Sequence, residues 1–385
     1  MRGEAEIAII GAGAGGLMTA SLLEKRSAFI FEGNSKAAAK IAVSGGGRCN
    51  ITNEVVEGSH YRGNPRFVEE ILRKFDQHDL LRWLRERGLQ PVLQKQQQYF
   101  CPKSANQLIE ILMRESRKQS LLLNFKVERV SRRDGWFYLE AGKRRFRAKK
   151  LVIASGGLSF PQLGAGDIGY RVAETFGHSI VRTSPALVGL TLQKEQFFFK
   201  ELSGISTEVE IRVGDQLCRG ALLFAHKGIS GPAVLDASLY WEKGKITIDF
   251  LPGWSISEHE KSKKQLASLL PLPRRVAKAF LEYLEISDRP VSQLKTAERE
   301  RLLELKNYTF APAGTFGYSK AEVTRGGVDT NEIDPKTMMS KRCEGLYFVG
   351  EVLDVTGRLG GYNFQWAFSS AALCAGALES GSGEL

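Results

Sequence analysis

A glycine-rich turn near the N-terminus constrains the fold of this chain more than any other feature. Ile7–Ile10 is a continuous apolar run, as is typical of a strand buried on both faces of a parallel sheet. Gly11, Gly13 and Gly16 follow with G-x-G-x-x-G spacing. The first glycine permits a tight turn, the second lets the backbone approach a pyrophosphate, and the third lets the next helix pack closely. The pattern predicts a strand–turn–helix unit that binds a dinucleotide.

The residues after this turn extend it into a β–α–β unit. Leu17–Lys25 is predicted to be a helix whose free amides and positive dipole end face the pyrophosphate. Ala28–Phe31 is predicted to be the second strand, and Glu32 ends it, 21 residues after Gly11. An acid there accepts hydrogen bonds from a ribose 2′-hydroxyl and repels a 2′-phosphate. The unit indicates an ADP-containing dinucleotide but does not separate NAD from FAD.

A second glycine-rich segment follows at Ala39–Asn53. It holds three consecutive glycines flanked by Ser44 on one side and by Arg48, Cys49 and Asn50 on the other. Free amides, polar side chains and a delocalised cation suit a second stretch of an elongated anionic ligand. The alternative is a glycine-rich surface turn. Cys49 is either a reactive thiol or a small packing residue.

A third glycine-rich unit lies near the C-terminus. Leu346–Glu351 is predicted to be another strand of the same sheet, ending beside the N-terminal strand, and Gly360–Asn363 to begin a helix. Because open α/β sheets gather ligands at the carboxyl ends of their strands, both ends of the chain are expected to face one crevice. One long ligand is simpler than two, and FAD has the required length. This argument favours FAD over NAD.

The stretches between these units alternate between helical and strand patterns. Helices are predicted at 67–75, 78–87 and 104–118, the last with Ser104 as its N-cap. Leu121–Val130 is predicted to be a strand of the main sheet, 135–146 an antiparallel excursion, and 150–157 a buried strand ending in a glycine turn. Further on, strands are predicted at 187–192, 206–213, 216–223 and 245–250, and helices at 271–286 and 291–306.

The composition bounds the class of protein. A chain of 385 residues indicates two or three domains, and 43% hydrophobic with 25% charged residues is ordinary for a soluble protein. No apolar run approaches the ~20 residues that span a bilayer, so no membrane partner is expected. The glycine motif begins by Gly11, which leaves no room for a targeting segment and predicts a cytoplasmic location. Five scattered cysteines without C-x-x-C or ligand spacing predict reduced thiols and no metal site.

The net charge of +11 needs an explanation. The densest basic run is Lys143–Lys150. A solvated surface that attracts phosphorylated small molecules accounts for such a charge. Nucleic-acid binding is the alternative, although the chain has no zinc-finger, RNP-like or basic-zipper signature.

Several long motifs closely resemble one family of bacterial flavoproteins. They are GAGAGGL, AVSGGGRCNITN, ASGGLSFPQLGAGDIGY, FAHKGISGPAVLDAS, AEVTRGGVDTNEIDPKTMMSK and GEVLDVTGRLGGYNFQWAFSSA. Together they resemble the BaiN/YhiN-type proteins, which are usually described as NAD(P)/FAD-dependent oxidoreductases and sometimes as aminoacetone oxidase-like. The resemblance covers nearly the whole chain.

The resemblance implies an α/β fold with a discontinuous, Rossmann-like FAD-binding domain at 1–185 and 335–385. Into it are inserted a β-rich subdomain, at 186–255 and 307–334, and a small helical subdomain at 256–306. It implies tight, non-covalent FAD. Because the chain has only one full G-x-G-x-x-G motif, NAD(P)H is expected to dock transiently on the flavin ring if it is the reductant. By motif match, the expected FAD contacts are Gly11, Gly13, Ala14, Gly16, Glu32, Lys40, Ser44, Gly45, Gly46, Arg48, Cys49, Asn50, Val127, Ser155, Gly156, Gly350, Glu351, Asp354, Gly360, Gly361, Tyr362 and Asn363.

Two segments depart from the family pattern. Ser27 stands where the dinucleotide motif often has glycine, which implies a shorter or stiffer turn. Gln94–Ser104 replaces a segment that resembles acidic-Gly-Arg-Val-Phe-Pro, so the resemblance alone supports no cofactor contact there.

The chemistry is less specified than the cofactor. Flavin carries its own hydride chemistry, and protein groups position the substrate. The candidate catalytic residues are His226 and Tyr362, either as proton donors or as structural groups. The sequence contains no catalytic triad. We expect an FAD-dependent oxidoreductase that acts on a small organic substrate, reducing an activated C=C bond or oxidising an amine. The alternatives are a flavin-bearing, RNA-acting protein with a basic surface, and a structural FAD protein without turnover.

Overall fold

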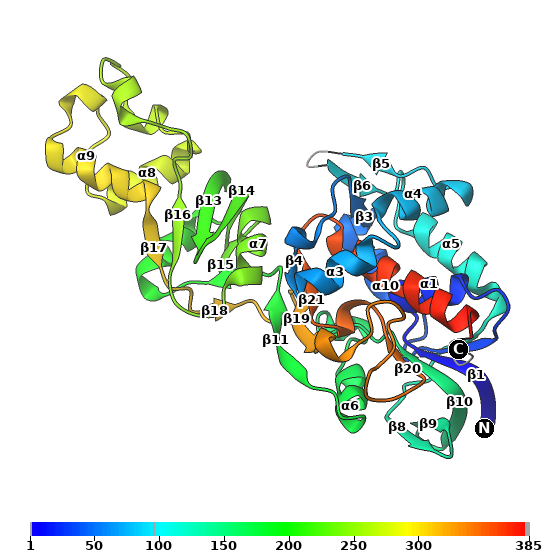
Figure 1. Cartoon of the computed structure of the whole chain (residues 1–385). Helices are drawn as coiled ribbons and strands as arrows, with labels where there is room; N and C mark the ends of the chain where they lie inside the picture. The colour runs from blue at the N-terminus through cyan, green and yellow to red at the C-terminus, as the bar shows by residue number, and fades with distance from the viewer. Residues whose placement is uncertain (1, 95–96, 382–385) are drawn as a thin grey trace. The chain divides into compact units, whose positions relative to one another are not determined.

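Five parallel strands form the centre of the sheet that the two ends of the chain build together (Figure 1). The computed structural model describes residues 2–94 and 97–381. The five parallel strands lie in the order β7-β2-β1-β10-β20, and each neighbouring pair is parallel. They are β1 (Arg2–Ile10), β2 (Ala28–Phe31), β7 (Ser120–Leu122), β10 (Arg144–Ile153) and β20 (Leu346–Phe348). The expected Rossmann-type α/β fold class is confirmed.

The chain order reverses beside β1. From β1 the chain passes to β2 and β7 on one side of the sheet, whereas β10 and β20 lie on the other side. The loops after β1 and β10 therefore leave the sheet in the arrangement of a topological switch point, where open α/β sheets bind ligands. One expectation is wrong here, because β20 pairs with β10 and does not reach β1.

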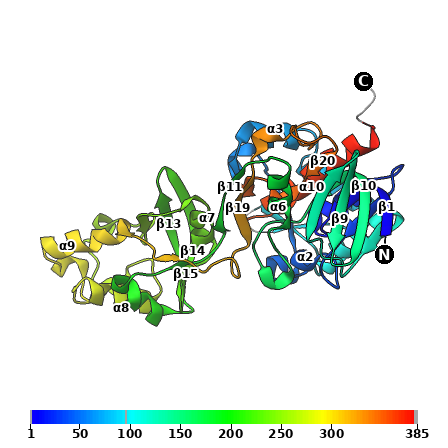
Figure 2. The same cartoon turned by 90° about the horizontal axis from the view of Figure 1, so that it is seen from below.

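An antiparallel meander extends this sheet at the N-terminal half of β10 (Figure 2). It consists of β8 (Arg129–Arg133) and β9 (Trp136–Ala141), in the order β10-β9-β8. The prediction of one strand over Leu121–Val130 is wrong, because Asn124 takes a positive φ of 53° and turns the chain after β7. Val127 consequently lies between strands. The basic run Lys143–Lys150 is largely part of β10 itself, continuous with the buried strand that follows it.

Helices cover the parallel strands. They are α1 (Ala14–Ser21), α2 (Ala39–Val43), α3 (Pro65–Leu72), α4 (Gln77–Glu86), α5 (Asn106–Glu115), α6 (Ile168–Thr175) and α10 (Tyr362–Glu379). α1 packs against α10, which brings the first and last helices together. α1 begins and ends earlier than predicted, because Gly13 is its N-cap. Ser104 is not the N-cap of α5; Ala105 takes that place, and the Gln107 side chain accepts the Lys103 and Ser104 amides.

Three small sheets complete this part of the chain. β3 (Asn50–Asn53) pairs with β6 (Gln98–Phe100), which pairs with β5 (Val92–Leu93); residues 95–96 of the segment between β5 and β6 lie outside the described residues. β4 (Tyr61–Gly63) pairs with β21 (Val355–Gly357). β11 (Ile180–Ala186) pairs with β19 (Val323–Val328), so the segments that carry the chain out of this unit and back into it are neighbours.

Contacts divide the chain into Met1–Pro185 with Glu322–Leu385, and Ala186–Ala321. The second unit has an antiparallel sheet in the order β17-β16-β13-β14-β15-β12-β18. Its strands are β12 (Leu190–Thr191), β13 (Ser206–Val213), β14 (Gln216–Ala225), β15 (Gly228–Ser230), β16 (Ile246–Asp249), β17 (Tyr308–Phe310) and β18 (Gly314–Thr315), and its helices α7 (Pro232–Tyr240), α8 (Arg274–Tyr283) and α9 (Thr296–Leu303). The boundaries differ from those expected: 322–334 belongs to the first unit, and the helices share one core with the sheet.

A buried polar cluster ties the end of α6 to the loop after β19. The Glu332 carboxylate accepts the Ser179 amide at 2.9 Å, approaches His178 Nδ1 at 3.0 Å and pairs with Arg342 at 2.5 Å. The hydrogen bond from Arg342 is the main cause that lowers the pKa of Glu332 to about 2. Burial lowers the pKa of His178. Both shifts oppose protonation of the folded state, so this cluster stabilises the fold least at low pH.

We predict that Glu332→Gln lowers the free energy of unfolding at neutral pH by roughly 1–3 kcal/mol, because three charge-assisted bonds are weakened. In the unmodified protein, the contribution of Glu332 is present above a pKa of ~4.3 and is lost as pH falls toward ~2. Denaturant unfolding at several pH values measures both effects. The exposed Glu174→Gln is the control. An unchanged acid dependence in Glu332→Gln contradicts the assignment.

Candidate functional site

Polar and glycine residues follow four neighbouring parallel strands at one edge of the sheet. Gly11 follows β1, Glu32 follows β2, Ser155 and Gly156 come soon after β10, and Gly350 comes soon after β20. Because the strands are parallel, these residues share the carboxyl edge of the sheet. Segments from both ends of the sequence therefore meet at one place.

The first glycine turn is packed tightly against the sheet except at one position. A Cβ on Gly11 would lie 2.4 Å from the Ala154 carbonyl oxygen, and one on Gly16 would lie 1.9 Å from the Gly11 carbonyl oxygen. Neither residue can carry a side chain without moving the backbone. At Gly13, by contrast, a Cβ would meet no protein atom within 4 Å. The closeness at Gly11 and Gly16 is internal packing, whereas the space beside Gly13 is open.

Two helices begin at this edge without side-chain caps. Gly13 is the N-cap of α1 and Gly361 is the N-cap of α10, and neither helix has a side-chain hydrogen bond at its cap. A helix N-terminus carries a partial positive charge and unsatisfied amides, which suit a pyrophosphate or another anion. A Cβ on Gly13 or Gly156 would meet no protein atom within 4 Å, so a ligand can approach the protein backbone closely at both residues.

Glu32 is held by the turn that it faces. Its Oε2 accepts the Ala12 amide at 3.0 Å, and its Oε1 accepts the Asn34 amide at 2.9 Å. A carboxylate has about four lone-pair positions, so each oxygen can accept a further hydrogen bond. Glu32 is thereby oriented and able to accept ribose hydroxyls.

The second glycine segment forms an open loop after α2. Gly45, Gly46 and Gly47 all have positive φ, and a Cβ on Gly46 or Gly47 would meet nothing within 4 Å. Cys49 has a φ of 48° and is fully buried. A hydrogen bond with Cys101 and burial raise the pKa of the Cys49 thiol well above its usual value, which favours a packing role over that of a thiolate.

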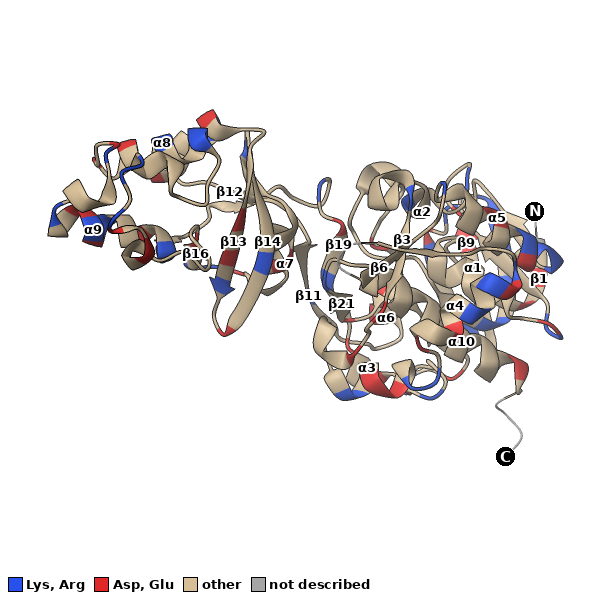
Figure 3. Ribbon diagram, turned by 90° about the horizontal axis from the view of Figure 1, so that it is seen from above, with Lys and Arg blue, Asp and Glu red and all other residues tan. Residues whose placement is uncertain are grey.

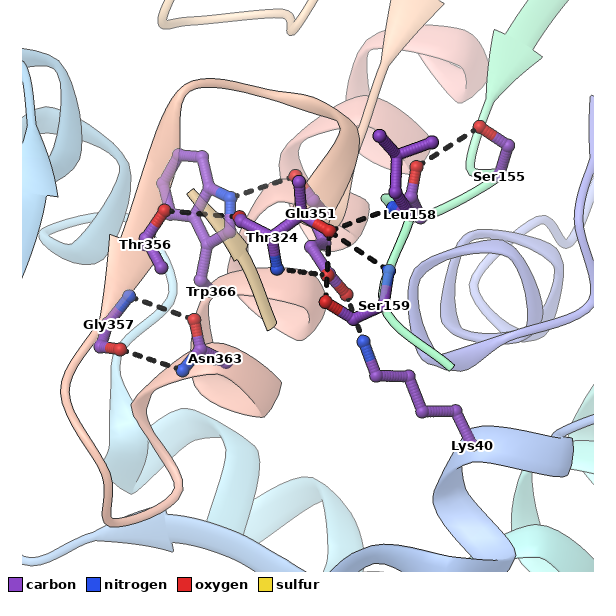
Figure 4. A network of polar contacts seen from close by, with 12 residues as sticks. Lys40, Ser155, Leu158, Ser159, Thr324, Glu351, Thr356, Gly357, Asn363 and Trp366 are labelled. Atoms are coloured by element: carbon purple, nitrogen blue, oxygen red, sulfur yellow. Dashed lines mark hydrogen bonds and ion pairs between the residues drawn. The ribbon is translucent and has the colours of Figure 1, made fainter. Parts of the chain in front are cut away.

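A polar network joins four segments of this site (Figure 4). Lys40 Nζ pairs with Glu351 Oε2 at 2.5 Å, and Glu351 Oε1 accepts the Thr324 amide at 2.8 Å. The Thr324 hydroxyl in turn accepts the amides of Leu158 and Ser159 at 2.8 and 3.1 Å. Helix α2, the loops after β10 and β20 and the strand β19 are thus fixed to one another. Thr324 was not among the residues expected from the sequence; its burial in a strand gives no functional signal.

The start of α10 is anchored by its own side chains. Asn363 Oδ1 accepts the Gly357 amide at 2.8 Å, and Asn363 Nδ2 donates to the Gly357 carbonyl at 2.9 Å. One turn further, Trp366 Nε1 donates to the Gly350 carbonyl at 3.1 Å, and Ser370 accepts the Gly350 amide at 3.0 Å. These bonds fix the turn before α10 and the turn after β20 in one arrangement (Figure 4).

The Gly360–Gly361 turn also meets the second glycine segment. The side-chain amides of Asn50 and Gln98 lie 2.7 Å apart, and a Cβ on Gly361 would lie 2.7 Å from Asn50 Oδ1. Gln98 belongs to the segment that departs from the family pattern, yet the structure brings it beside Gly360. Gln98 therefore lies next to the turn before α10, although its segment departs from the family pattern.

Tyr362, the first residue of α10, has an aromatic partner that the sequence analysis missed. Its ring stacks on His60, with centroids 4.6 Å apart and an angle of 18°, and its carbonyl accepts the Tyr61 hydroxyl at 3.0 Å. Burial, followed by the nearby Arg358, lowers the pKa of His60. The Glu57 amide donates to His60 Nδ1, so the neutral ring carries its proton on Nε2. An isolated histidine at the end of a single 3₁₀ turn offers no periodic or motif signal.

The remaining expected residues are distributed as follows. Val127 is buried just after the turn that follows β7. Asp354 lies next to β21, and burial raises its pKa despite the nearby Arg62. Ala14 begins α1, and the Ser44 hydroxyl donates to the Ile41 carbonyl at 2.8 Å. His226 lies exposed in the turn between β14 and β15 of the second unit.

Within 2–94 and 97–381, no group of three or more His, Cys, Asp or Glu side chains is arranged to hold a metal ion. Over the same residues, none of the helices has the length and apolar character needed to cross a bilayer. The five cysteines are free and buried.

The fold and this edge define a Rossmann-type dinucleotide-binding protein. The family model for the HI0933-like protein Rossmann domain matches residues 5–377, and the chain belongs to this family. It is 40% identical, over 95% of its length and 96% of the relative's, to the ribosomal RNA dihydrouridine synthase of Haemophilus influenzae. It is 38% identical to the protein of that name from Escherichia coli, over 95% and 96% of the two chains. It is 31% identical to the 3-dehydro-bile acid delta(4,6)-reductase of Clostridium scindens, over 95% and 97%.

Solved structures share the fold at low sequence identity. A flavocytochrome c3 fumarate reductase matches 98% of this chain and 78% of its own, with a TM-score of 0.51 and 14% identity. The 3-ketosteroid-delta4-(5alpha)-dehydrogenase of Rhodococcus jostii matches 98% and 97%, with a TM-score of 0.51 and 11% identity. These likenesses extend over nearly the whole chain and concern the fold alone.

The contrast between the two glycines gives a prediction. Gly13→Ala should fold normally, because its Cβ meets no protein atom and its φ of −88° suits alanine, yet it should lose at least about tenfold in affinity for FAD. Gly16→Ala should lower stability, because its Cβ collides with the Gly11 carbonyl. Thermal unfolding and FAD titration of the apoprotein separate the two effects.

The exposed Gly376→Ala in α10 is the matched control, since it adds the same methyl group away from this edge. It should leave FAD affinity unchanged. If Gly13→Ala binds FAD as tightly as Gly376→Ala does, the pyrophosphate does not approach the α1 turn.

Proposed function

We propose that the protein is an FAD-dependent reductase that adds hydrogen across the C5=C6 bond of uridine in ribosomal RNA, with NAD(P)H as reductant. The observation that carries this proposal is the identity of 40% and 38%, each over 95% of the chain, to two ribosomal RNA dihydrouridine synthases. The net charge of +11 agrees with a polyanionic substrate. The sequence alone favoured a small organic substrate and placed RNA second; because of these two relatives, our proposal places RNA first.

The chemistry of the third relative supports the same class of reaction. A bile-acid delta(4,6)-reductase acts on carbon–carbon double bonds, and its substrate name places a ketone at carbon 3. The C5=C6 bond of uracil is likewise conjugated to a carbonyl group. In both cases a hydride adds to the carbon remote from the carbonyl and a proton to the adjacent carbon. One type of site can therefore serve both substrates.

The residues at the carboxyl edge fit FAD. The α1 amides behind Gly13 would hold the pyrophosphate, and Glu32 would hold the adenosine ribose. The open glycines of the second segment and the start of α10 would hold the flavin half. The Lys40–Glu351 pair would keep these segments in place. Bound flavin would supply the hydride chemistry.

The chain must still orient the base and supply a proton. Uridine, NAD(P)H and one proton give dihydrouridine and NAD(P)⁺, so one acidic group must face the substrate. Tyr362 is our candidate, because it begins α10 beside the glycine turn and is held by His60 and Tyr61. The alternative function is reduction of a small conjugated ketone, supported by the 31% relative.

The direct test uses ribosomal RNA transcribed in vitro, which lacks dihydrouridine. Incubated with the FAD-loaded protein and NADH or NADPH, the RNA should gain two hydrogens at a defined uridine, detected by mass spectrometry of nuclease fragments. The Gly13→Ala variant is the negative control. If the RNA is unchanged while small conjugated ketones are reduced, the alternative function holds.

The role of Tyr362 gives a separate prediction. Tyr362→Phe should slow product formation by roughly 10²-fold or more, because general acid catalysis contributes that much. Reduction of the flavin by NAD(P)H should be unaffected; it is measured under anaerobic conditions as bleaching of the flavin absorbance. A proportional loss in both half-reactions would instead indicate a structural role for Tyr362.

A further inference from the structure

The antiparallel meander β8–β9–β10 carries most of the excess positive charge of the protein. Residues 129–150 contain nine Lys and Arg but two Asp and Glu, a net charge of +7, against +11 for the whole chain. Figure 3 shows Lys and Arg gathered around β1 and β9. This region lies at the N-terminal half of β10, away from the glycine turns, so cofactor binding does not explain it.

The meander has one buried face and one exposed face. Val130, Phe137, Leu139, Phe146 and Ala148 are buried in the core of the first unit. The alternate residues point the opposite way, because side chains alternate along a strand. Registers between the strands place these outward residues in three rows across β8, β9 and β10. The first two rows are Arg129–Glu140–Arg145 and Ser131–Tyr138–Arg147. The third pairs Arg133 with Trp136, and Lys149 of β10 reaches the Trp136 ring.

The outward face therefore has aromatic rings on its central strand and cations on both sides. The Arg147 guanidinium carbon lies 4.4 Å from the centre of a Trp136 ring, and Lys149 Nζ lies 3.8 Å from it. Cation–π contact fixes the position of both charges on the sheet. Tyr138 and Trp136 are both half-buried, which leaves part of each side chain accessible.

Acidic neighbours do not cancel this charge. Glu140 pairs with Arg145 at 3.2 Å, Asp134 with Arg133 at 3.2 Å and Glu4 with Arg147 at 2.6 Å. These pairs involve exposed side chains, and exposed ion pairs are worth little, so a phosphate can compete for the cations. Five cations on the face against three acids leave it positive.

We propose that the outward face of β8–β9–β10 is a docking surface for the RNA substrate, away from the reactive edge. The inference rests on the proposed function for the identity of the RNA, and on the charge and aromatic array for the location. Phosphates contact the flanking cations, and unpaired bases stack on Tyr138 and Trp136, as single-stranded RNA does on aromatic sheet faces. A small ketone substrate would leave such a surface without a role.

The test compares two triple variants with equal loss of charge. Arg129→Gln, Arg145→Gln and Lys149→Gln remove one cation from β8 and two from β10, on the exposed face. Lys261→Gln, Lys263→Gln and Lys264→Gln remove three exposed cations from the second unit. The probe is a mixed-sequence, single-stranded RNA of about 16 nucleotides, titrated at several salt concentrations. The flavin absorbance spectrum and thermal unfolding establish that each variant is folded.

The first variant should bind RNA about tenfold or more weakly at low salt, with the slope of log K against log salt reduced by roughly 2. The second should bind as the unmodified protein does. Trp136→Ala should weaken binding at every salt concentration without changing the slope, because stacking releases no counterions. Equal RNA affinity of the two triple variants would overturn the inference.

Vesicles of phosphatidylserine and phosphatidylcholine provide a second arm. If the β8–β10 variant loses vesicle binding, and neither triple variant nor the unmodified protein binds RNA, the face recognises lipid and the proposal is wrong. These experiments distinguish a failure of the docking proposal from a failure of the proposed reaction. RNA binding that depends on the face without dihydrouridine formation would refute the reaction alone; dihydrouridine formation with unchanged binding by the variant would refute the docking surface alone.

Discussion

The close approach of two strand ends, β1 and β10, is the constraint on which the site depends. A Cβ on Gly11 would lie 2.4 Å from the Ala154 carbonyl oxygen, so only glycine lets the two turns lie in contact. Gly16 then brings α1 down onto the same turn. The order of strands reverses at this point, and the space beside Gly13 opens there. Backbone packing, with no specialised side chain, thus creates the place where a pyrophosphate is expected.

The second requirement is that distant segments keep a fixed geometry around this place. Thr324 and Glu351 supply it, because between them they bond Lys40, Leu158 and Ser159. Lys40 lies in α2, and Leu158 and Ser159 lie in the loop after β10, far from Thr324 and Glu351 in the sequence. A long ligand that touches all of these segments needs them pre-positioned, since ordering each on binding would cost conformational entropy. The C-terminal helix belongs to the same arrangement, because Trp366 and Ser370 hold the turn after β20.

Much of this architecture was readable from the sequence, because it depends on local patterns. The turn at Gly11–Gly16, strand β2 and its terminal Glu32, and the helix after Gly361 are short-range features with strong steric or periodic signals. The wrong predictions concern strand bounds and strand neighbours, which depend on tertiary contacts. Asn124, a single residue of positive φ, turns the chain within Leu121–Val130, so that β7 pairs with β2 and β8 pairs with β9. The pairing of β20 with β10 and the burial of Thr324 depend on residues more than 150 positions away.

The site was partly readable for the same reason. The spacing of the glycines predicts their role from the sequence. His60 becomes a candidate site residue only through its ring contact with Tyr362, some 300 residues later, which the sequence does not reveal. His226, attractive in sequence because it stands between a strand and a glycine turn, belongs to the other unit. The charge of the chain was visible from the start, but its concentration on one face required the register of β8, β9 and β10.

The central claim is that both ends of the chain hold one FAD at the carboxyl edge of the parallel sheet. A crystal structure of the protein with FAD tests it directly. The account predicts one FAD per chain, with its pyrophosphate at the N-terminus of α1 and its flavin ring beside Gly360–Asn363. A flavin ring elsewhere, or a pyrophosphate remote from Gly13, would contradict it.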